Sequence, residues 1–386
     1  MDYFKIISGI LLIIFLIYFI KETYNYPLLK YIKYIKNCKL KRNLSQTLKI
    51  YHQKNIFLSI CIPAYNMEKY IESALLSVIN QSFLFFEVII VNDNSNDNTL
   101  NIINQIQSKD KRIKIINHIN NQGVYASRVD AILNSNGNYI LLMDPDDILL
   151  NQDLFQELYT YNEKYNLDII EFLVYRQKDD EKNIIIPKDH ILSHQHNFLK
   201  NIINQPELSE LIFYKPNTND YSIIICRNIW NKLIRTQIMS KIINYLNNDY
   251  FKNQFLIAAD DTPLNILAFR YAENYSHINI PGYLYHLRND GMSSNNKGNI
   301  EHDKILSYNF LLYFKFLFKY ISYFNMDINF FLYDFGHFAV YLYDLKYLNV
   351  SEYIPMAIEF FEEIKRKAIP ENFRKYINYL IEYFSH

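Results

Sequence analysis

The chain has 386 residues, half of them hydrophobic, which is enough to form one large domain or two of ordinary size. Its 40 Lys and Arg residues are matched by 40 Asp and Glu residues, which argues against a protein that binds nucleic acid through an excess of positive charge. The three cysteines have no C-x-x-C spacing, which argues against a disulfide framework or a zinc site.

The first element along the chain is an uncharged apolar run from Ile6 to Ile20, bracketed by Lys5 and Lys21. It just reaches the length of a membrane-spanning helix, and no small-residue cleavage site follows it. We therefore expect a single-pass transmembrane anchor over residues 1–24 and a polar, Lys-rich stalk over residues 25–54. A buried or interfacial helix is the alternative. More lysines follow the run than precede it, which favours a cytoplasmic catalytic domain, but the opposite orientation stays open.

Strands and helices alternate from about residue 56 onward. Short apolar runs rich in β-forming residues predict strands, and apolar residues at helical spacing predict the helices between them. The expected strands are 57–62, 86–91, 113–117 and 139–143; the expected helices are 68–80, 97–107, 124–133 and 154–165, with Asp97 as the N-cap of the second. This order predicts an α/β fold with a Rossmann-like, mostly parallel sheet flanked by helices.

Polar segments follow each of the four expected strands. They are residues 63–66, 92–95, 118–123 and 144–147, and two of them carry acids. In an open parallel sheet, ligands bind outside the carboxyl ends of the strands. These four segments are therefore the expected ligand site.

The last of these segments, Asp144-Pro145-Asp146-Asp147, places three carboxylates within four residues. Such a cluster repels itself unless a cation neutralises it, and hard oxygen ligands favour Mg²⁺ or Mn²⁺. Pro145 makes the turn stiff, because its ring fixes φ. The alternative is a solvated acidic turn that caps the next helix.

Three further side chains at the strand ends are candidates for binding a nucleotide. Asp93 follows the second strand, where a carboxylate can accept a hydrogen bond from a base or a ribose; an Asx-turn or helix cap is the alternative. Tyr65 follows the first strand and could contact a base ring, or it is a packing tyrosine. Arg128, on the third helix, can pair with a phosphate or with a carboxylate of the site, or it lies on a solvated helix face.

Taken together, residues 58–151 resemble the family 2 glycosyltransferases of GT-A fold. The matching motifs are Ile62-Pro63-Ala64-Tyr65-Asn66, Gln81-Ser82-Phe83, residues 91–99, Asn121-Gln122-Gly123 through Arg128, and Gly137 through Asp147, in the order and spacing of the family. Two positions depart from the family pattern. Asn94 stands where glycine is frequent, and Asn tolerates the left-handed conformation that this position requires. Val129 stands where the family often has Asn.

The resemblance implies a role for each matching residue. Asp144 and Asp146 form the D-x-D motif, with Asp146 as the direct contact to Mn²⁺ or Mg²⁺. The nucleotide sugar, usually carrying uridine, is expected at Pro63, Tyr65, Asp93, Arg128 and Asp144.

The second half of the chain carries weaker motifs of the same family. Residues 228–233 resemble the segment that shapes the acceptor side, and Trp230 is either a sugar-stacking or a core residue. Residues 259–265 resemble the element that carries the catalytic base, for which Asp261 is the first choice and Asp260 the second; helix capping is the alternative. Residues 285–293 resemble the segment that closes over the diphosphate, where His286 or Arg288 contacts phosphate.

The sequence thus predicts a GT-A domain over residues 55–300 and a helical C-terminal region over residues 301–386. The expected activity is a metal-dependent, inverting sugar transfer of the hexosyltransferase type, from a nucleotide-diphosphate donor to a glycan, protein or lipid acceptor at a membrane, with no nucleic acid involved. A degenerate, non-catalytic GT-A protein and another nucleotide-sugar enzyme are the alternatives. The absence of a Gly-rich phosphate loop after the first strand argues against a nucleotidyltransferase.

Overall fold

The computed structural model describes residues 56–178, 202–205, 228–249, 254–256, 260–289, 300–323, 354–367, 369 and 371–385. The expected membrane anchor and stalk, residues 1–54, lie outside these ranges. Within them, no helix combines the length and the apolar character needed to cross a membrane.

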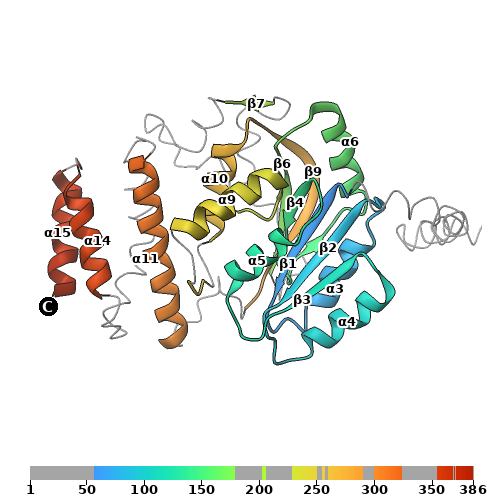
Figure 1. Ribbon diagram of the computed structural model, residues 1–386, viewed down its shortest axis with the longest axis horizontal. Coiled ribbons are helices and arrows are strands. Elements are labelled where there is room, and N and C mark those ends of the chain that lie inside the picture. Colours follow the sequence, from blue (N-terminus) through green and yellow to red (C-terminus); the bar gives the residue numbers. More distant parts are fainter. Residues whose placement is uncertain are drawn as a thin grey trace, which may run out of the picture. The chain divides into compact units, whose positions relative to one another are not determined.

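The described residues form an α/β fold built on one mixed sheet of nine strands (Figure 1). The strands are β1 Leu58–Ala64, β2 Phe86–Asn92, β3 Ile113–Asn117, β4 Tyr139–Leu142, β5 Ile148–Leu149, β6 Ile169–Lys178, β7 Ile203–Asn204, β8 Lys232–Arg235 and β9 Asn274–Leu287. The helices are α3 Ile71–Ile79, α4 Thr99–Lys109, α5 Val124–Leu133, α6 Leu154–Tyr165, α9 Thr236–Asp249, α10 Asp261–Tyr271, α11 Ile300–Tyr323, α14 Ile354–Lys365 and α15 Glu371–Ser385.

The strand order is β3-β2-β1-β4-β8-β6-β9-β5, with β7 paired to β9. The four strands expected from the sequence lie next to one another and are all parallel. Beyond them the prediction of a mostly parallel sheet needs correction, because β8 runs antiparallel to both β4 and β6, and β5 and β7 run antiparallel to β9. Strand direction in this half depends on long-range pairing, which local hydrophobic patterns do not encode.

Two of the expected boundaries change for identifiable reasons. The sequence predicts that Pro63 ends the first strand, but β1 continues through it to Ala64. Successive residues of β1 direct their backbone polar groups to opposite sides of the strand. Cys61 O accepts from Met143 N on the β4 side, whereas Ala64 O, three residues later, accepts from Asp93 N on the β2 side. The backbone nitrogen of Pro63 therefore faces the β4 side. The last β1–β4 pair is Cys61 with Leu142, so beyond it the missing N–H of Pro63 interrupts no hydrogen bond of the ladder.

The second corrected boundary is the start of α4. Asn98, and not Asp97, occupies the N-cap position. Asp97 still satisfies the first turn, because its Oδ1 accepts a hydrogen bond from Thr99 N at 3.0 Å. Its Oδ2 accepts from Glu68 N at 3.1 Å, which joins the start of α4 to the turn before α3.

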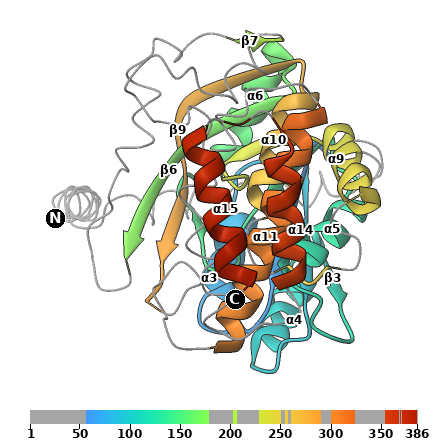
Figure 2. The same cartoon turned by 90° about the vertical axis from the view of Figure 1, so that its left-hand side faces the viewer.

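Side chains alternate between two hydrophobic cores on the two faces of the parallel strands. Ile60 and Ile62 of β1 pack with α3, α4 and α6, whereas Cys61 packs with α5, α9 and α10. Figures 1 and 2 show these two groups of helices on either side of the sheet. The second core continues through α11, α14 and α15. The expectation of parallel strands buried on both faces is therefore confirmed for β1 and β2, whose residues are all buried.

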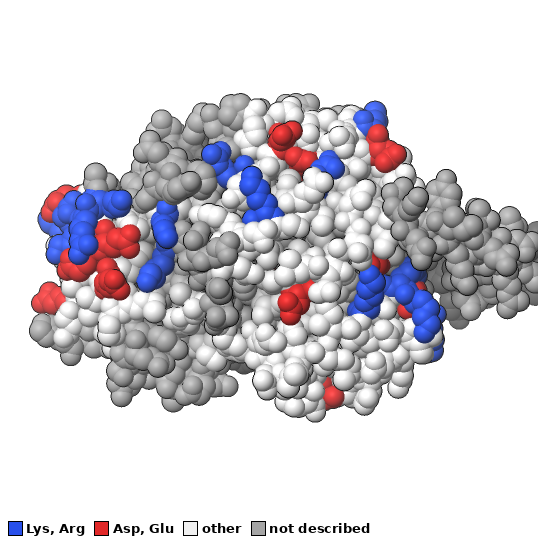
Figure 3. Space-filling model, viewed as in Figure 1, with Lys and Arg blue, Asp and Glu red and all other residues white. Residues whose placement is uncertain are grey.

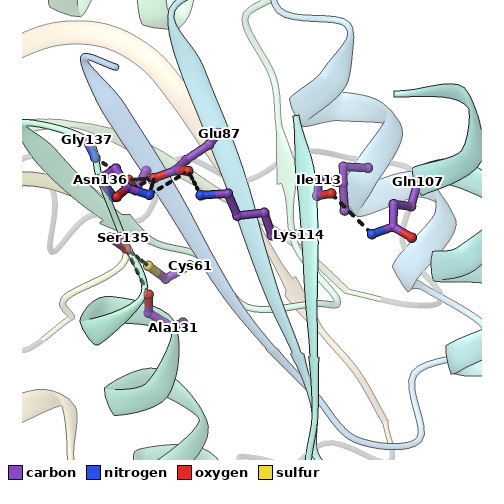
Figure 4. Close-up of polar contacts among 10 residues, drawn as sticks. Cys61, Glu87, Gln107, Ile113, Lys114, Ala131, Ser135, Asn136 and Gly137 are labelled. Atoms are coloured by element: carbon purple, nitrogen blue, oxygen red, sulfur yellow. Dashed lines mark hydrogen bonds and ion pairs between the residues drawn. The ribbon is translucent and has the colours of Figure 1, made fainter. Parts of the chain in front are cut away.

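A buried carboxylate holds the amino ends of the parallel strands together (Figure 4). Glu87 of β2 accepts hydrogen bonds from Ser59 Oγ at 2.8 Å, from Lys114 Nζ at 2.6 Å and from the main-chain N of Asn136 at 2.6 Å. Gly137 N in turn donates to Ser59 Oγ at 2.8 Å. These contacts anchor the turn that leads into β4.

Charged side chains of both signs gather over α14 and α15 in the face shown in Figure 3. Two ion pairs between residues three apart lie in this region, Lys365–Glu362 at 3.7 Å and Arg374–Glu371 at 3.8 Å. Because charges of both signs are mixed along these helices, this surface is typical of a solvated helix face and not of a binding site for a polyanion.

Candidate active site

The loops after β1 and β2 are bonded to each other at the carboxyl edge of the sheet. Asn66 N donates to Ser95 Oγ at 3.1 Å, and Asn96 N donates to Asn66 Oδ1 at 2.8 Å. Asn66 and Asn94 both adopt the left-handed conformation, with φ of 53° and 59°. The prediction that Asn94 lies at a left-handed position is thereby confirmed. Tyr65, the first residue of the loop after β1, is 39% exposed, so a ligand can reach it.

Asp93 lies beneath these loops and is only 3% exposed. Its Oδ1 accepts from Gln122 N at 2.8 Å and lies 2.6 Å from His118 Nδ1, and its Oδ2 accepts from Gly123 N at 2.9 Å. The carboxylate thus joins the end of β2 to the loop that precedes α5. Pro63, at the end of β1, is buried and contributes backbone shape to this edge.

Arg128 connects acids that are far apart in the sequence. It projects from α5, is 5% exposed, and donates to Asp144 Oδ1 at 2.8 Å, Asp260 Oδ2 at 2.6 Å and Asp261 Oδ1 at 2.6 Å. Of the alternatives that the sequence left open, the structure excludes the solvated helix face. The guanidinium joins the acidic segment after β4 to the acids at the start of α10.

The acidic segment after β4 is held mainly by β9. Asp144 N donates to Tyr283 Oη at 3.0 Å, and the fully buried Asp147 accepts from His286 N at 2.8 Å. Asp146 Oδ2 forms an ion pair with Arg288 Nε at 2.9 Å. The next helix, α6, has Asp153 at its N-cap position. The alternative of a solvated turn that caps this helix is therefore wrong.

Burial and crowding of the acids raise several pKa values in this site. Burial, reinforced by Asp144 and offset by Arg288, raises the pKa of Asp146 to about 6. Burial, with Asp144 and Asp146 adding to it, raises the pKa of Asp147 well above its usual range. Raised pKa values of several neighbouring carboxylates indicate a site with too little positive charge to balance its acids.

The same imbalance extends to the acids of α10. Burial raises the pKa of Asp261 to about 7; Arg128 opposes this shift, while Asp260 and Asp144 add to it. Asp260 occupies the N-cap position of α10, but its side chain makes no capping hydrogen bond. Its oxygen bonds Arg128 instead, which argues against the capping alternative for this residue.

This donor set fits a divalent cation that completes its coordination with a ligand. Among the described residues, no three or more His, Cys, Asp or Glu side chains surround one point as a closed metal site. Asp144 and Asp146, however, supply two carboxylates, and the pKa of the neighbouring Asp147 is raised. Mg²⁺ is typically held by one or two carboxylates together with phosphate oxygens and water.

Arg288 and His286 lie against the loop after β1. The Arg288 guanidinium lies 5.1 Å from the centre of the Tyr70 ring, and the His286 ring meets the same tyrosine edge-on at 5.5 Å. The structure therefore brings both residues of the expected diphosphate segment to the rim that carries Asp146. Tyr70 was missed by sequence reasoning, because one tyrosine among 35 gives no signal by itself.

Trp230 lies inside the molecule and not at a sugar-accessible surface. It is 4% exposed, and its indole stacks on Tyr283 at 4.6 Å and on Tyr285 at 5.2 Å. Because both neighbours are aromatic residues of β9, this placement favours the core role that the sequence left open over sugar stacking.

Two residues after Trp230, Lys232 takes part in a buried ion pair that the sequence did not predict. Lys232 is fully buried, and its Nζ lies 3.2 Å from Glu171 Oε1; it also donates to Asn228 O at 2.6 Å. Tyr275 Oη donates to Glu171 Oε2. These contacts join β6, β8 and β9.

Comparisons with known proteins agree with this architecture. The chain is 27% identical over 228 residues to the uncharacterized glycosyltransferase EpsJ of Bacillus subtilis, which covers 59% of this chain and 60% of the relative. It is 32% identical over 109 residues to a GalNAc(5)-diNAcBac-PP-undecaprenol beta-1,3-glucosyltransferase of Campylobacter jejuni, covering 28% of this chain and 35% of the relative. Each match thus spans less than two thirds of the relative's length.

Among solved structures, S. aureus TarS 1-349 in complex with UDP-GlcNAc has the same fold. Its TM-score is 0.50 at 20% identity, and the match covers 84% of each chain. Residues 59–242 match the family model described as Glycosyl transferase family 2. Residues 59–242 therefore form a glycosyl transferase family 2 domain, of GT-A-like fold.

Proposed function

We propose that this protein is a metal-dependent glycosyltransferase that moves a sugar, with inversion, from a nucleotide-diphosphate donor to an acceptor hydroxyl. The observation that carries the proposal is Arg128, which gathers Asp144, Asp260 and Asp261 from distant parts of the chain at the carboxyl edge of the sheet. In open α/β sheets this edge binds ligands, and nucleotides in particular. The family 2 domain and the fold shared with a UDP-GlcNAc-bound structure favour a UDP-sugar as the donor.

The nucleoside is assigned to Tyr65 and Asp93. A carboxylate has about four acceptor positions on its two oxygens. Asp93 uses three of them for Gln122 N, Gly123 N and His118, so one position remains for an N–H of the base. The exposed ring of Tyr65 supplies a face on which the base can stack.

The cation and the diphosphate are assigned to the acidic segment after β4. Asp144 and Asp146 would hold Mn²⁺ or Mg²⁺, which when bound supplies Lewis-acid stabilisation of the departing nucleoside diphosphate. Arg288, now paired with Asp146, and His286 lie beside this position and would contact phosphate oxygens.

Asp261 is assigned as the general base, with Asp260 held behind it. Asp261 has the more accessible side chain, 29% exposed against 3% for Asp260. Its carboxylate takes the proton of the acceptor hydroxyl while the acceptor oxygen bonds to the anomeric carbon and the bond from that carbon to the diphosphate oxygen breaks. A pKa of about 7 suits a base that works near neutral pH.

The acceptor is proposed to be a glycan, protein or lipid at a membrane. The support is the apolar run from Ile6 to Ile20, assigned as a single-pass anchor. An undecaprenol-linked acceptor in the name of the Campylobacter relative is compatible with this setting.

The experiment that tests the proposal is donor turnover by the full chain with Mn²⁺ or Mg²⁺, using a panel of UDP- and GDP-sugars. We expect release of the nucleoside diphosphate from one donor, dependent on the cation, and its loss in Asp146→Ala. Glu163→Gln, at an exposed acid of α6, is the matched control and should retain turnover. Absence of cation-dependent turnover and of binding with every donor would instead identify a degenerate, non-catalytic GT-A protein.

A further inference from the structure

His118 is held between two carboxylates at the edge of the proposed nucleoside site. Its Nδ1 lies 2.6 Å from Asp93 Oδ1, and its Nε2 lies 2.9 Å from Asp130 Oδ2. The imidazole is buried, whereas the Asp130 side chain is 42% exposed on α5. His118 follows β3 and also donates its main-chain N to Asn92 O at 3.0 Å. The ring therefore joins the end of β2 to a helix across the loop after β3.

Among the described residues, Asp93 links the His118 ring to the two main-chain amides that precede α5. The same oxygen that faces His118, Oδ1, accepts from Gln122 N, and Oδ2 accepts from Gly123 N. The orientation of the carboxylate thus decides where these two amides lie, and it decides which acceptor position remains for a base. His118 limits rotation of the carboxylate, because a short hydrogen bond to a charged acceptor is strong and directional.

Gly123 is fixed from its other side as well. It has φ of +90°, and a Cβ at this position would lie 2.5 Å from the carbonyl oxygen of Leu256. It is also the N-cap residue of α5, the helix that carries Arg128. The link from His118 to Asp93 and Gly123 therefore leads to the helix whose arginine gathers the acids of the site.

We propose that His118 is a positioning residue for donor binding, acting through Nδ1 on Asp93 and not by contact with the donor. This inference rests on the proposed function, since it assigns the nucleoside to the Asp93 edge. The bond from Nε2 to Asp130 sets the plane of the ring, and the bond from Nδ1 sets the carboxylate.

Two substitutions distinguish the hydrogen bonds made by the two ring nitrogens of His118. The amide nitrogen of Asn takes the place of Nδ1, and that of Gln takes the place of Nε2. His118→Asn should retain the bond to Asp93 and bind UDP with Mn²⁺ within about threefold of the unmodified chain, a difference below 1 kcal/mol by the relation between affinity and free energy. His118→Gln should lose that bond and weaken UDP binding by about tenfold or more, as expected for one charge-assisted hydrogen bond.

The measurements are calorimetric titration of UDP with Mn²⁺ and the donor KM and kcat of each variant. The weakening in His118→Gln should lie in KM, with kcat changed less. Equal binding by the Asn and Gln variants, or weaker binding by Asn than by Gln, would overturn the proposal. Thermal melting curves identify a variant that fails to fold; in that case His118→Ala, which also lacks a donor to Asp93, replaces it and should weaken binding by about tenfold or more, and unchanged binding would overturn the proposal.

Amide hydrogen exchange gives a readout that needs no donor. The amides of Gln122 and Gly123 should exchange faster in His118→Gln than in His118→Asn, because only the Gln variant releases Asp93. If the unmodified chain binds no nucleotide, the proposed function fails while exchange still decides the role of His118. Equal exchange in both variants would overturn the inference.

Discussion

A single buried carboxylate and a cluster of acids lie at opposite ends of the same parallel strands, and their electrostatic environments are opposite. At the amino ends, Glu87 is surrounded by donors. Burial alone would raise its pKa, but hydrogen bonds from Lys114, Asn136 N and Ser59 outweigh burial and lower the pKa. At the carboxyl ends, burial raises the pKa values of Asp146 and Asp261; neighbouring acids add to these shifts, and Arg288 and Arg128 only partly offset them.

The difference separates structural from functional use of a buried acid. Glu87 has its donors within the fold, so it stabilises the turn into β4 and requires no ligand (Figure 4). The acids at the other end have too little positive charge within the fold, and a cation and donor would complete them. A cluster that costs stability in the absence of its ligand is a common property of active sites.

The largest effect is expected at the functional end. Asp261→Asn removes the proposed base while it keeps the size of the side chain and removes one of the crowded charges. We expect kcat to fall by about 10²–10⁴-fold, the contribution of a positioned general base. The free energy of unfolding should stay the same or rise, because the raised pKa of Asp261 marks an unfavourable charge. A loss of stability as large as the loss of activity would contradict the comparison; steady-state kinetics and urea unfolding measure both.

A substitution at the structural end should have the reverse profile. Glu87→Gln replaces the charged acceptor of Lys114 and weakens the bonds from Asn136 N and Ser59 Oγ. We expect the free energy of unfolding to fall by about 1–3 kcal/mol, the range for a buried hydrogen bond to a charged group. Activity at a temperature where the variant is folded should change little, and a large change in kcat would show that the turn into β4 controls the site.

Acid should act on the structural carboxylates as a group. Glu171 shares the behaviour of Glu87: burial would raise its pKa, but Lys232, with His277 and Tyr275, lowers it far below its usual range. A carboxylate with a lowered folded-state pKa stabilises the protein above its unfolded pKa and loses this contribution as pH falls. Stability should therefore decline as pH falls below about 4.5, and the decline should be shallower in Glu87→Gln. Thermal melting between neutral and acidic pH tests this, and an unchanged slope would contradict it.

The smallest effect is expected at Asn94, which lies at the functional end but contributes through its backbone. Its φ of 59° is unfavourable for most residues but not for glycine. Asn94→Ala should lower the free energy of unfolding by about 1 kcal/mol, and Asn94→Gly should not. Equal stability of the two variants would show that the side chain, and not the conformation, is selected here.

Much of the parallel half could be predicted from the sequence. β3, α5 and α6 begin and end where periodicity places them, and the family resemblance is confirmed over residues 59–242. The antiparallel strand β8 could not be found in this way. Its four residues include the buried Lys232, whose charge obscures the apolar pattern and is balanced by Glu171 of β6, the neighbouring strand.

The sequence by itself determined which chemical groups stand at the carboxyl ends of the strands, because strand and turn patterns are local properties of the chain. Only the tertiary structure decided how those groups are paired. It buries Trp230 against β9, gives Arg128 three carboxylate partners, and places His118 between Asp93 and Asp130. Pairing and burial depend on contacts between residues far apart in the chain, such as Asp144 and Tyr283, which are 139 positions apart, and such contacts leave no periodic signal in the sequence.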